Sequence, residues 1–163
     1  AMIEHQLKRA ASSGQDLWHK QIKVKPLIDK LEQALSKIYR DKGCAIEIHC
    51  TDQVVFRGDE TDLMEILGNL LDNACKACQE RVRLSVQCKP LQLTVEDDGP
   101  GVPMDKKAQL LSRGARLDTY TDGHGVGLSI VDELCQSYQG QLEISQSTLG
   151  GASFSLIFAQ HQY

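Results

Sequence analysis

The chain has 163 residues, of which 41% are hydrophobic and 25% are charged, and its formal net charge is -4. This length and composition predict one globular domain with a sizeable core and exclude a disordered tail. The net negative charge gives no sign of a nucleic-acid partner, so any phosphate ligand must be held by local geometry. Because the chain contains neither an apolar run of membrane-spanning length nor a signal-peptide pattern, we expect the fragment to be soluble.

Six cysteines lie along the chain, a number that would suit the disulfide framework of a secreted protein. Four of them fall in the apolar phase of predicted strands or helices, and this placement favours the reduced thiols of a cytosolic protein. Cys75 and Cys78 have the spacing of half a zinc site. Because this pair falls inside a predicted helix and no second pair has ligand spacing, we expect no metal ligation there.

The first part of the chain is predicted to contain two helices. Residues 4–11 read as helix and precede a polar break, so residues 1–12 look like the end of an element of a longer protein and residues 13–25 like a linker. A second helix is predicted to begin at Pro26, a residue suited to a first helical position, and to end near Gly43. Its apolar face would consist of Leu27, Leu31, Ala34, Leu35 and Ile38.

Two short strands and a further helix are expected next. Alternating apolar and polar residues over 44–50 and the apolar run at 54–56 predict the strands. Asp59 is a suitable N-cap for the helix, and Asp62 favours its positive end. At core-facing spacing, the apolar residues of this helix are Leu63, Ile66, Leu67, Leu70, Leu71, Ala74 and Ala77.

The opposite face of that helix carries an unusual polar stripe. Glu65, Asn69, Asn73 and Lys76 follow one another at intervals of three or four residues and therefore share a face. Carboxamide oxygens can ligate a hard cation, amide nitrogens can donate to phosphate, and a lysine adds a compact positive charge. The stripe predicts a magnesium-nucleotide site; the alternative is an amphipathic helix with solvated asparagines.

A hairpin and a long loop are predicted to follow. Apolar residues alternate over 82–88 and again over 91–95, with a lysine-proline turn between them. Residues 104–124 are polar and basic with little periodicity. We therefore expect a long mobile loop there, of the kind that often serves as a lid over a binding site.

One helix and two closing strands complete the predicted domain. The helix spans residues 127–138, with Val131, Leu134, Cys135 and Tyr138 buried, and ends at Gly140. The closing strands lie around 142–144 and 154–158. These elements predict an α+β fold for residues 26–160, a two-layer sandwich of a mixed, mostly antiparallel sheet with helices on one face.

Asp97 is a candidate ligand-binding residue at the end of the hairpin's second strand. Alternation places it in phase with Leu93 and Val95, so its carboxylate is predicted to point inward. Gly99 and Gly101 follow, and such glycines let backbone approach a ligand closely. The carboxylate could accept a hydrogen bond from an exocyclic amine and so select adenine over guanine; the alternative is an aspartate that stabilises a tight turn.

The glycine-rich sequence at 123–128 opens the next predicted helix. Glycine-rich turns at a helix N-terminus expose amide donors that bind anions. The sequence is neither a Walker loop, since no Gly-Lys-Ser/Thr follows, nor a convincing Rossmann fingerprint. In the loop before it, Arg113 and Arg116 are possible phosphate contacts, whereas Lys106 and Lys107 are more simply explained as solvated surface.

These three motifs, in this order, resemble the ATP-binding domain of sensor histidine kinases, within the wider superfamily that includes gyrase, the Hsp90 chaperone and MutL. The resemblance covers residues 27–158 and implies a Bergerat-type ATP-binding fold. The N box of that family is matched at 69–76, its G1 box at 97–101 and its G2 box at 123–128. At the F-box phenylalanine the chain departs from the family, with Leu111 in its place.

The resemblance also implies residue roles. Asn73 would ligate magnesium, while Asn69 and Lys76 would contact the phosphates of ATP. Asp97 would read the adenine amino group, and the second glycine turn would close on the phosphates. The catalytic residues would be Asn69, Lys76 and Arg116. The nucleotide-binding residues would be Asn69, Asn73, Lys76, Asp97, Gly99, Gly101, Arg113, Arg116, His124, Gly125, Val126, Gly127 and Leu128.

In that family the phosphoacceptor histidine lies on a separate helical hairpin, in a proline-containing context that none of the five histidines here has. We therefore expect this chain to bind ATP without carrying its own phosphorylation site. Residues 1–12 would be the end of the dimerisation hairpin of the parent kinase. The implied partners are that hairpin and a response regulator. The resemblance further implies a monomeric cytoplasmic domain of a bacterial inner-membrane sensor.

Two other functions stay open at this point. One is a nucleotide-sensing module that docks on the hairpin and regulates phosphatase activity without transferring phosphate. The other is an ATP-hydrolysing clamp of the gyrase type. Those clamps place a glutamate base one helical turn before the magnesium asparagine, and here that position is Asn69.

Overall fold

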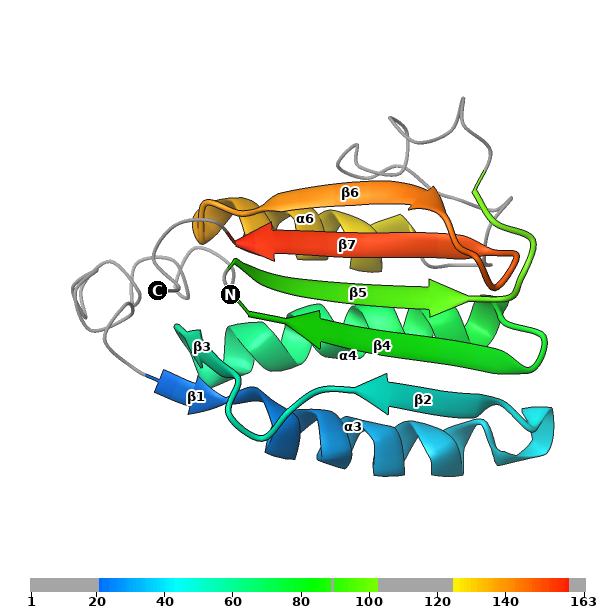
Figure 1. Cartoon of the computed structure of the whole chain (residues 1–163). Coiled ribbons are helices and arrows are strands. Elements are labelled where there is room, and N and C mark those ends of the chain that lie inside the picture. The colour runs from blue at the N-terminus through cyan, green and yellow to red at the C-terminus, as the bar shows by residue number, and fades with distance from the viewer. Residues whose placement is uncertain (1–20, 89, 103–124, 159–163) are drawn as a thin grey trace.

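The computed structural model describes residues 21–88, 90–102 and 125–158, which form two sheets and three α-helices (Figure 1). In chain order the elements are β1 (Gln21–Lys23), α3 (Val24–Ile38), the short 3₁₀ helix η1 (Arg40–Lys42), β2 (Ala45–His49), β3 (Val55–Arg57), α4 (Glu60–Ala77), β4 (Arg81–Gln87), β5 (Leu91–Asp97), α6 (Gly125–Ser137), β6 (Gln141–Gln146) and β7 (Ala152–Phe158).

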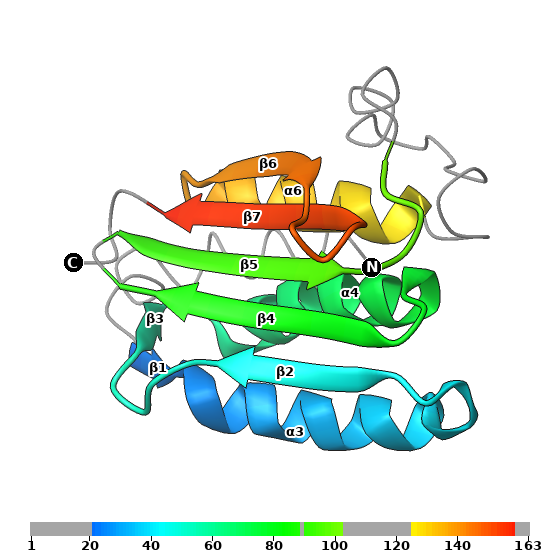
Figure 2. The same cartoon turned by 45° about the vertical axis from the view of Figure 1, so that its right-hand side comes forward.

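The main sheet has five strands in the order β2-β4-β5-β7-β6. Its neighbouring strands are antiparallel except for β2 and β4, which run parallel. Figures 1 and 2 show α3, α4 and α6 together on one face of this sheet. The predicted α+β sandwich with a mixed, mostly antiparallel sheet is therefore confirmed. A separate two-stranded sheet pairs β1 with β3.

The core lies between the helices and the main sheet. Alternate residues of β5 are buried, as expected for a strand with one face against helices. The apolar face predicted for α4 is confirmed, because its leucine and isoleucine side chains are all fully buried. Other large core side chains, all buried, are Ile28, Phe56, Leu84, Leu93, Tyr138, Phe154, Leu156 and Phe158.

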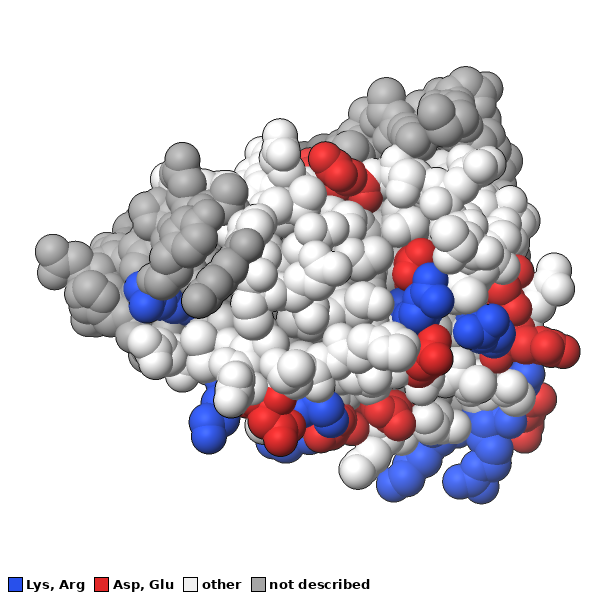
Figure 3. Space-filling view, in the orientation of Figure 1, with Lys and Arg blue, Asp and Glu red and all other residues white. Residues whose placement is uncertain are grey.

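The other face of the sheet is polar and carries few charges at its centre. In Figure 3, charged side chains gather along the lower and right-hand margins of this face. Thr94 of β5 and Ser155 of β7 are paired in register, and their hydroxyl oxygens lie 2.6 Å apart. Arg83 and Glu96 form an ion pair across β4 and β5, with Nε and Oε2 2.9 Å apart.

The N-terminal part of the fold differs in detail from the sequence prediction. Helix α3 begins at Val24, so Pro26 occupies its first turn, where a missing N–H interrupts no helical hydrogen bond. The predicted apolar face is wrong at Ala34, which is exposed, and at Ile38, whose exposed fraction is 68%. Strand β1 was not predicted. The helix expected at 4–11 lies outside the described residues.

The ends of the other helices follow ordinary capping chemistry. The Asp59 carboxylate accepts a hydrogen bond from the backbone N–H of Thr61 at 2.9 Å, which confirms the predicted N-cap of α4. Helix α6 begins at Gly125, two residues earlier than predicted. The residue after it in the left-handed region is Gln139, with φ 59°, rather than Gly140. Of the helices in the described ranges, none combines the length and apolar character needed to cross a bilayer.

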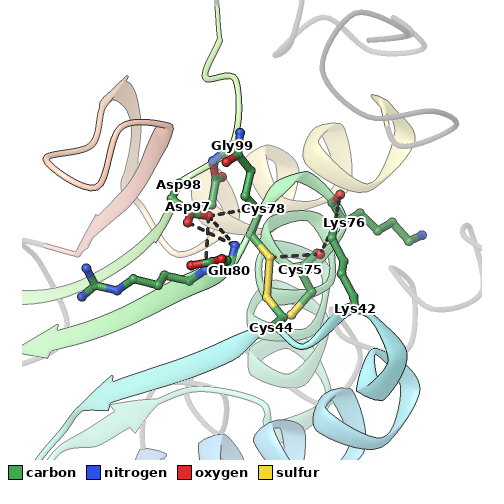
Figure 4. The surroundings of a disulfide bond; sticks show 11 residues. Lys42, Cys44, Cys75, Lys76, Cys78, Glu80, Asp97, Asp98 and Gly99 are labelled. Atoms are coloured by element: carbon green, nitrogen blue, oxygen red, sulfur yellow. Dashed lines mark hydrogen bonds between the residues drawn. A yellow bond between two sulfur atoms is a disulfide. The ribbon is translucent and has the colours of Figure 1, made fainter.

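The expectation that all cysteines are reduced is wrong for two of them. Cys44 and Cys78 form a disulfide, whereas Cys50, Cys75, Cys88 and Cys135 are free (Figure 4). Cys44 directly precedes β2, and Cys78 is the C-cap of α4, so the parallel pairing of β2 with β4 brings these two segments together. Periodicity within each element could not reveal this long-range contact.

Candidate functional site

The polar stripe of α4 is present as predicted, and its members differ in burial. Asn73 is 3% exposed, Asn69 is half-buried, and Lys76 is exposed. The side-chain nitrogen of Asn69 donates to the carbonyl oxygen of Glu65 at 2.8 Å. This bond fixes the carboxamide plane, so that the side-chain oxygen of Asn69 is the atom turned toward the neighbouring helix.

That neighbouring helix is α6, which the glycine-rich motif opens. A Cβ atom built at Gly127 would lie 3.0 Å from the side-chain oxygen of Asn69. Glycine therefore permits the start of α6 to approach the stripe closely. The structure thus brings the second glycine motif and the asparagine helix together. The predicted contacts His124, Arg113 and Arg116 lie outside the described residues, as does the expected lid at 104–124.

Asp97, at the end of β5, is fully buried and points inward as predicted. One oxygen of its carboxylate, Oδ1, accepts backbone N–H bonds from Gly99 at 2.9 Å and from Ala152 at 3.3 Å. The backbone N–H of Gly151 donates to the main-chain oxygen of Asp97 at 3.1 Å. A Cβ at Gly151 would overlap the carboxylate, so the Leu-Gly-Gly turn before β7 must present glycine here.

The turn after Asp97 also packs against α4. A Cβ at Gly99 would overlap the carbonyl oxygen of Ala77 in the last turn of that helix. Gly101 has φ 78°, a left-handed conformation that glycine adopts without steric strain. The end of β5 therefore lies against the last turn of α4, and the start of α6 lies against Asn69 of the same helix. Three motifs far apart in sequence meet at one edge of the domain.

Asp98 has a structural role that the sequence did not reveal. Its carboxylate accepts backbone N–H bonds from Gln79, Glu80 and Arg81, at distances from 2.8 to 3.2 Å (Figure 4). Burial opposes ionisation, but these backbone bonds outweigh it and hold the pKa of Asp98 below its ordinary value of 3.8. Asp98 thus anchors the connection from α4 to β4 beside the Asp97 turn. The N–H groups that it binds lie 17 to 19 residues earlier in the chain, so no local pattern indicated these bonds.

A second contact not predicted from the sequence supports the last turn of α4. The Tyr39 hydroxyl donates to Asp72 at 2.5 Å, and the other carboxylate oxygen of Asp72 lies 3.2 Å from the Lys76 ammonium. Lys42 donates to the carbonyl oxygens of Cys75 and Lys76 (Figure 4). Tyr39 and Asp72 are 33 residues apart, so no local pattern could have indicated their contact.

Comparison with known proteins places this geometry in a family. Residues 58–162 match the family described as histidine kinase-, DNA gyrase B-, and HSP90-like ATPase. The chain belongs to this family of ATPases. The match includes all three motifs of the site, but it begins after α3 and the first three strands.

The individual relatives are sensor kinases. The chain is 40% identical over 161 residues to the sensor protein PhoQ of Escherichia coli strain K12, covering 97% of this chain and 33% of the relative. It is 42% identical over 139 residues to the virulence sensor histidine kinase PhoQ of Salmonella typhimurium strain LT2, covering 84% of this chain and 28% of that protein. The chain therefore spans about a third of the length of the curated relatives it matches.

Solved structures agree on the fold. The mycobacterial sensor histidine kinase MprB superposes with a TM-score of 0.74 at 22% identity, covering 85% of this chain and 97% of that one. The catalytic domain of histidine kinase ThkA gives 0.75 at 19% identity, covering 85% and 93%. Full-length ShkA in complex with AMPPNP gives 0.73 at 25% identity, covering 86% and 30%. The fold is that of histidine kinase catalytic domains.

Proposed function

We propose that this chain is the catalytic domain of a PhoQ-like sensor histidine kinase, and that it transfers the γ-phosphoryl group of ATP to a histidine on a separate dimerisation domain. One observation carries the proposal. The buried Asp97 carboxylate lies at the end of a central strand, between two glycine turns, and the turn that follows it packs against the last turn of α4, the helix that carries the asparagines. Family membership and the PhoQ relatives support the same function.

Adenine selection is assigned to Asp97. Two backbone N–H groups hold one oxygen of its carboxylate, so the carboxylate has a fixed orientation. A carboxylate accepts hydrogen bonds and cannot donate them when ionised. It would therefore bind the exocyclic amino group of adenine, whereas guanine presents a carbonyl oxygen at the corresponding ring position.

The residues of α4 fit magnesium and phosphate. Asn73 offers a carboxamide oxygen, an oxygen ligand suited to a hard cation, at a position that is 97% shielded from solvent, since the residue is 3% exposed. Magnesium, when bound, would neutralise phosphate charge. Asn69 and Lys76 would contact the phosphates, and we assign the same task to Arg113, Arg116 and His124 of the expected lid at 104–124, which lies outside the described residues.

The reaction needs little covalent chemistry from this chain. In phosphoryl transfer the protein mainly positions the reacting groups and stabilises charge. An imidazole nitrogen of the separate hairpin would form the bond to the γ-phosphorus as the bond to the bridging oxygen breaks, which leaves ADP. No general base is required from this domain, because the imidazole supplies its own lone pair.

Asn69 favours transfer over hydrolysis. Gyrase-type clamps activate water with a glutamate at the position of Asn69, and a carboxamide cannot act as that base. Here the Asn69 amide is hydrogen-bonded to the carbonyl of Glu65 and its oxygen faces Gly127. The second hydrogen of this NH₂ group is the one that would donate to a phosphate oxygen, whereas the side chain has no basic atom that could activate water.

The parent protein would supply the remaining parts. Residues 1–12 would be the end of its dimerisation helix, and residues 13–25 would be a linker. The last residues of this linker, 21–25, form β1 and the first two positions of α3. The partners would be the phosphoacceptor hairpin and a PhoP-like response regulator, with this domain on the cytoplasmic side of a bacterial inner membrane. By itself the domain would be monomeric.

A transfer assay tests the proposal. The chain is mixed with magnesium-ATP and a separate hairpin domain taken from E. coli PhoQ, and acid-labile phosphohistidine is measured on the hairpin. We expect transfer by the wild-type chain and by Gln33→Ala, which removes an exposed carboxamide of α3. Asn73→Ala should reduce transfer to background. Absence of phosphohistidine with wild type, or full transfer by Asn73→Ala, would overturn the assignment.

A further inference from the structure

The end of α3 contacts α4 next to Lys76. Tyr39, the residue that caps the C-terminus of α3, donates its hydroxyl hydrogen bond to Asp72 Oδ1 at 2.5 Å. The second oxygen of the same carboxylate, Oδ2, lies 3.2 Å from Lys76 Nζ. One carboxylate is thus shared between a neutral donor on one side and an ammonium on the other.

Tyr39 remains a hydrogen-bond donor at physiological pH. Burial, and after it the hydrogen bond to Asp72, raise the pKa of Tyr39 above its ordinary value of 10.0. The phenol is therefore protonated throughout the neutral range, and it continuously occupies one oxygen of Asp72. A hydrogen bond from a neutral donor spreads part of the carboxylate's charge and fixes the plane of the group.

Lys76 is supported at its backbone, and its ammonium forms an ion pair with Asp72 that is partly exposed to solvent. Lys42 caps the last carbonyls of α4 at Cys75 and Lys76, which fixes the main chain beneath the side chain. Lys76 and Asp72 side chains are each 34% exposed, and ion pairs this exposed are weak. The ammonium can therefore leave Asp72 for a more highly charged anion without disturbing the helix.

We propose that Tyr39 is a positioning residue for phosphate binding, which acts by holding Asp72 so that Lys76 remains available to the nucleotide. This inference rests on the proposed function, because it takes the anion to be the phosphates of ATP. Without the hydroxyl, Asp72 could rotate, retain Lys76 more strongly, and place an uncompensated negative charge near the phosphates. Both effects weaken binding of phosphates and leave the adenine contact unchanged.

Tyr39→Phe therefore has a selective expected effect. The ring and its packing remain, and only the hydroxyl is lost. We expect the dissociation constants of ATP and ADP to rise about three- to tenfold, the effect of one hydrogen bond. The dissociation constant of adenosine, which has no phosphate, should not change. In an Asp72→Asn background the same substitution should have no effect, because the carboxylate through which Tyr39 acts is absent.

The experiment measures displacement of a fluorescent ATP analogue from the full 163-residue chain by ATP, ADP and adenosine in the presence of magnesium. The variants are Tyr39→Phe, Asp72→Asn and the double variant. Tyr138→Phe is the matched control, since it also removes a hydroxyl bonded to an aspartate of α4, Asp62, but at the opposite end of the helix. The control should lower thermal stability without a phosphate-dependent change in affinity.

Each result has a defined meaning. A loss confined to ATP and ADP, abolished by Asp72→Asn, supports the inference. An equal change for adenosine, an unchanged ATP affinity, or an effect that persists in the Asp72→Asn background would overturn it while leaving the proposed function intact. Absence of ATP binding by the wild-type chain would overturn the proposed function, and this inference with it.

Discussion

Asp97 and Asp98 are adjacent carboxylates with different surroundings. Strand geometry turns successive side chains to opposite sides, so Asp97 enters the core while Asp98 turns toward the α4–β4 connection. Asp97 has two bonds from backbone N–H groups on one oxygen, and glycines surround it. The carboxylate oxygens of Asp98 accept hydrogen bonds from the backbone N–H groups of residues 79–81. Two adjacent aspartates therefore have different roles: Asp98 anchors the α4–β4 connection, and Asp97 is the residue proposed to bind adenine.

Asp97→Asn should weaken ATP binding and reduce discrimination against GTP. The side-chain oxygen can still accept the bonds from Gly99 and Ala152, but an NH₂ group then replaces the second carboxylate oxygen and faces the adenine amino group donor to donor. We expect a loss of roughly ten- to a hundredfold in ATP affinity, the range for a hydrogen bond to a charged group. Titration with ATP and GTP measures both quantities.

The control for this substitution is its neighbour in β5. Glu96→Gln removes a charge from the other face of the strand, where Glu96 pairs with Arg83. That variant should keep its preference for ATP over GTP. If Asp97→Asn retains the wild-type preference, Asp97 is a structural residue of the turn and does not read the base.

At the scale of elements, side-chain hydrogen bonds hold α4 near its N-terminus, near its C-terminus and at the connection that follows it. Near the N-terminus, Tyr138, the residue that follows α6, donates to the buried Asp62 at 2.7 Å and accepts from the Asp59 N–H at 3.0 Å. Near the C-terminus, Tyr39 and Lys42 provide the contacts described above. Just beyond the helix, Asp98 binds three successive backbone N–H groups. The helix that carries the asparagines is therefore a rigid support.

The Asp98 anchor makes the fold sensitive to acid. A carboxylate whose pKa is lowered in the folded state stabilises that state above its unfolded pKa, here about 3.8, and this contribution is lost as pH falls through the lowered folded value. Asp98→Asn should therefore be less stable than wild type at pH 7. The difference in unfolding free energy between the two proteins should become smaller as pH falls below about 4. Urea unfolding at pH 7, 5, 4 and 3 measures this.

An exposed aspartate serves as the comparison. Asp41 is an exposed residue of η1, and the acceptor for the backbone N–H groups of residues 79–81 is Asp98, so Asp41→Asn should follow the wild-type pH dependence of stability. A constant gap between Asp98→Asn and wild type across the whole pH series would show that the charge of Asp98 contributes nothing to folding.

Sequence predicted most of the fold because periodicity is local. The burial of α4, the hairpin, the inward Asp97 and the closing strands all follow from the spacing of apolar residues within a single element. The exposure of Ile38, the Cys44–Cys78 bond and the Tyr39–Asp72 contact depend on how distant elements pack, and no short window contains that information. The left-handed Gln139 was missed because glycine is the more common residue there.

At the scale of the whole molecule, the disulfide connects two parts of the domain. It joins the start of the edge strand β2 to the end of α4, across 34 residues of sequence. Cross-linking of this kind stabilises a protein mainly by restricting its unfolded chain. The bond therefore limits how far the start of the edge strand and the end of the asparagine helix can separate when the chain unfolds.

Reduction should lower stability without unfolding the domain. A loop of this length corresponds to about 3–4 kcal/mol of unfolding free energy. Thiol titration of the denatured, unreduced chain should find four free cysteines, Cys50, Cys75, Cys88 and Cys135. Urea unfolding with and without a dithiol reductant should show this decrease in unfolding free energy. Cys44→Ala should be insensitive to reductant, whereas Cys88→Ser should respond as wild type does. Six reactive thiols before reduction would contradict the bond.

The support of Lys76 comes from a different stretch of sequence than the motif it serves. The family match begins at residue 58, whereas Tyr39, Lys42 and Cys44 all precede it. If Tyr39 positions Lys76 as proposed, substitutions outside the family motifs will change the affinity for nucleotide. Grafting residues 24–57 from another member of the family onto this chain would replace all the contacts that support Lys76 at once. Domains with identical ATP motifs could in this way differ in their affinity for ATP and work at different cellular ATP concentrations.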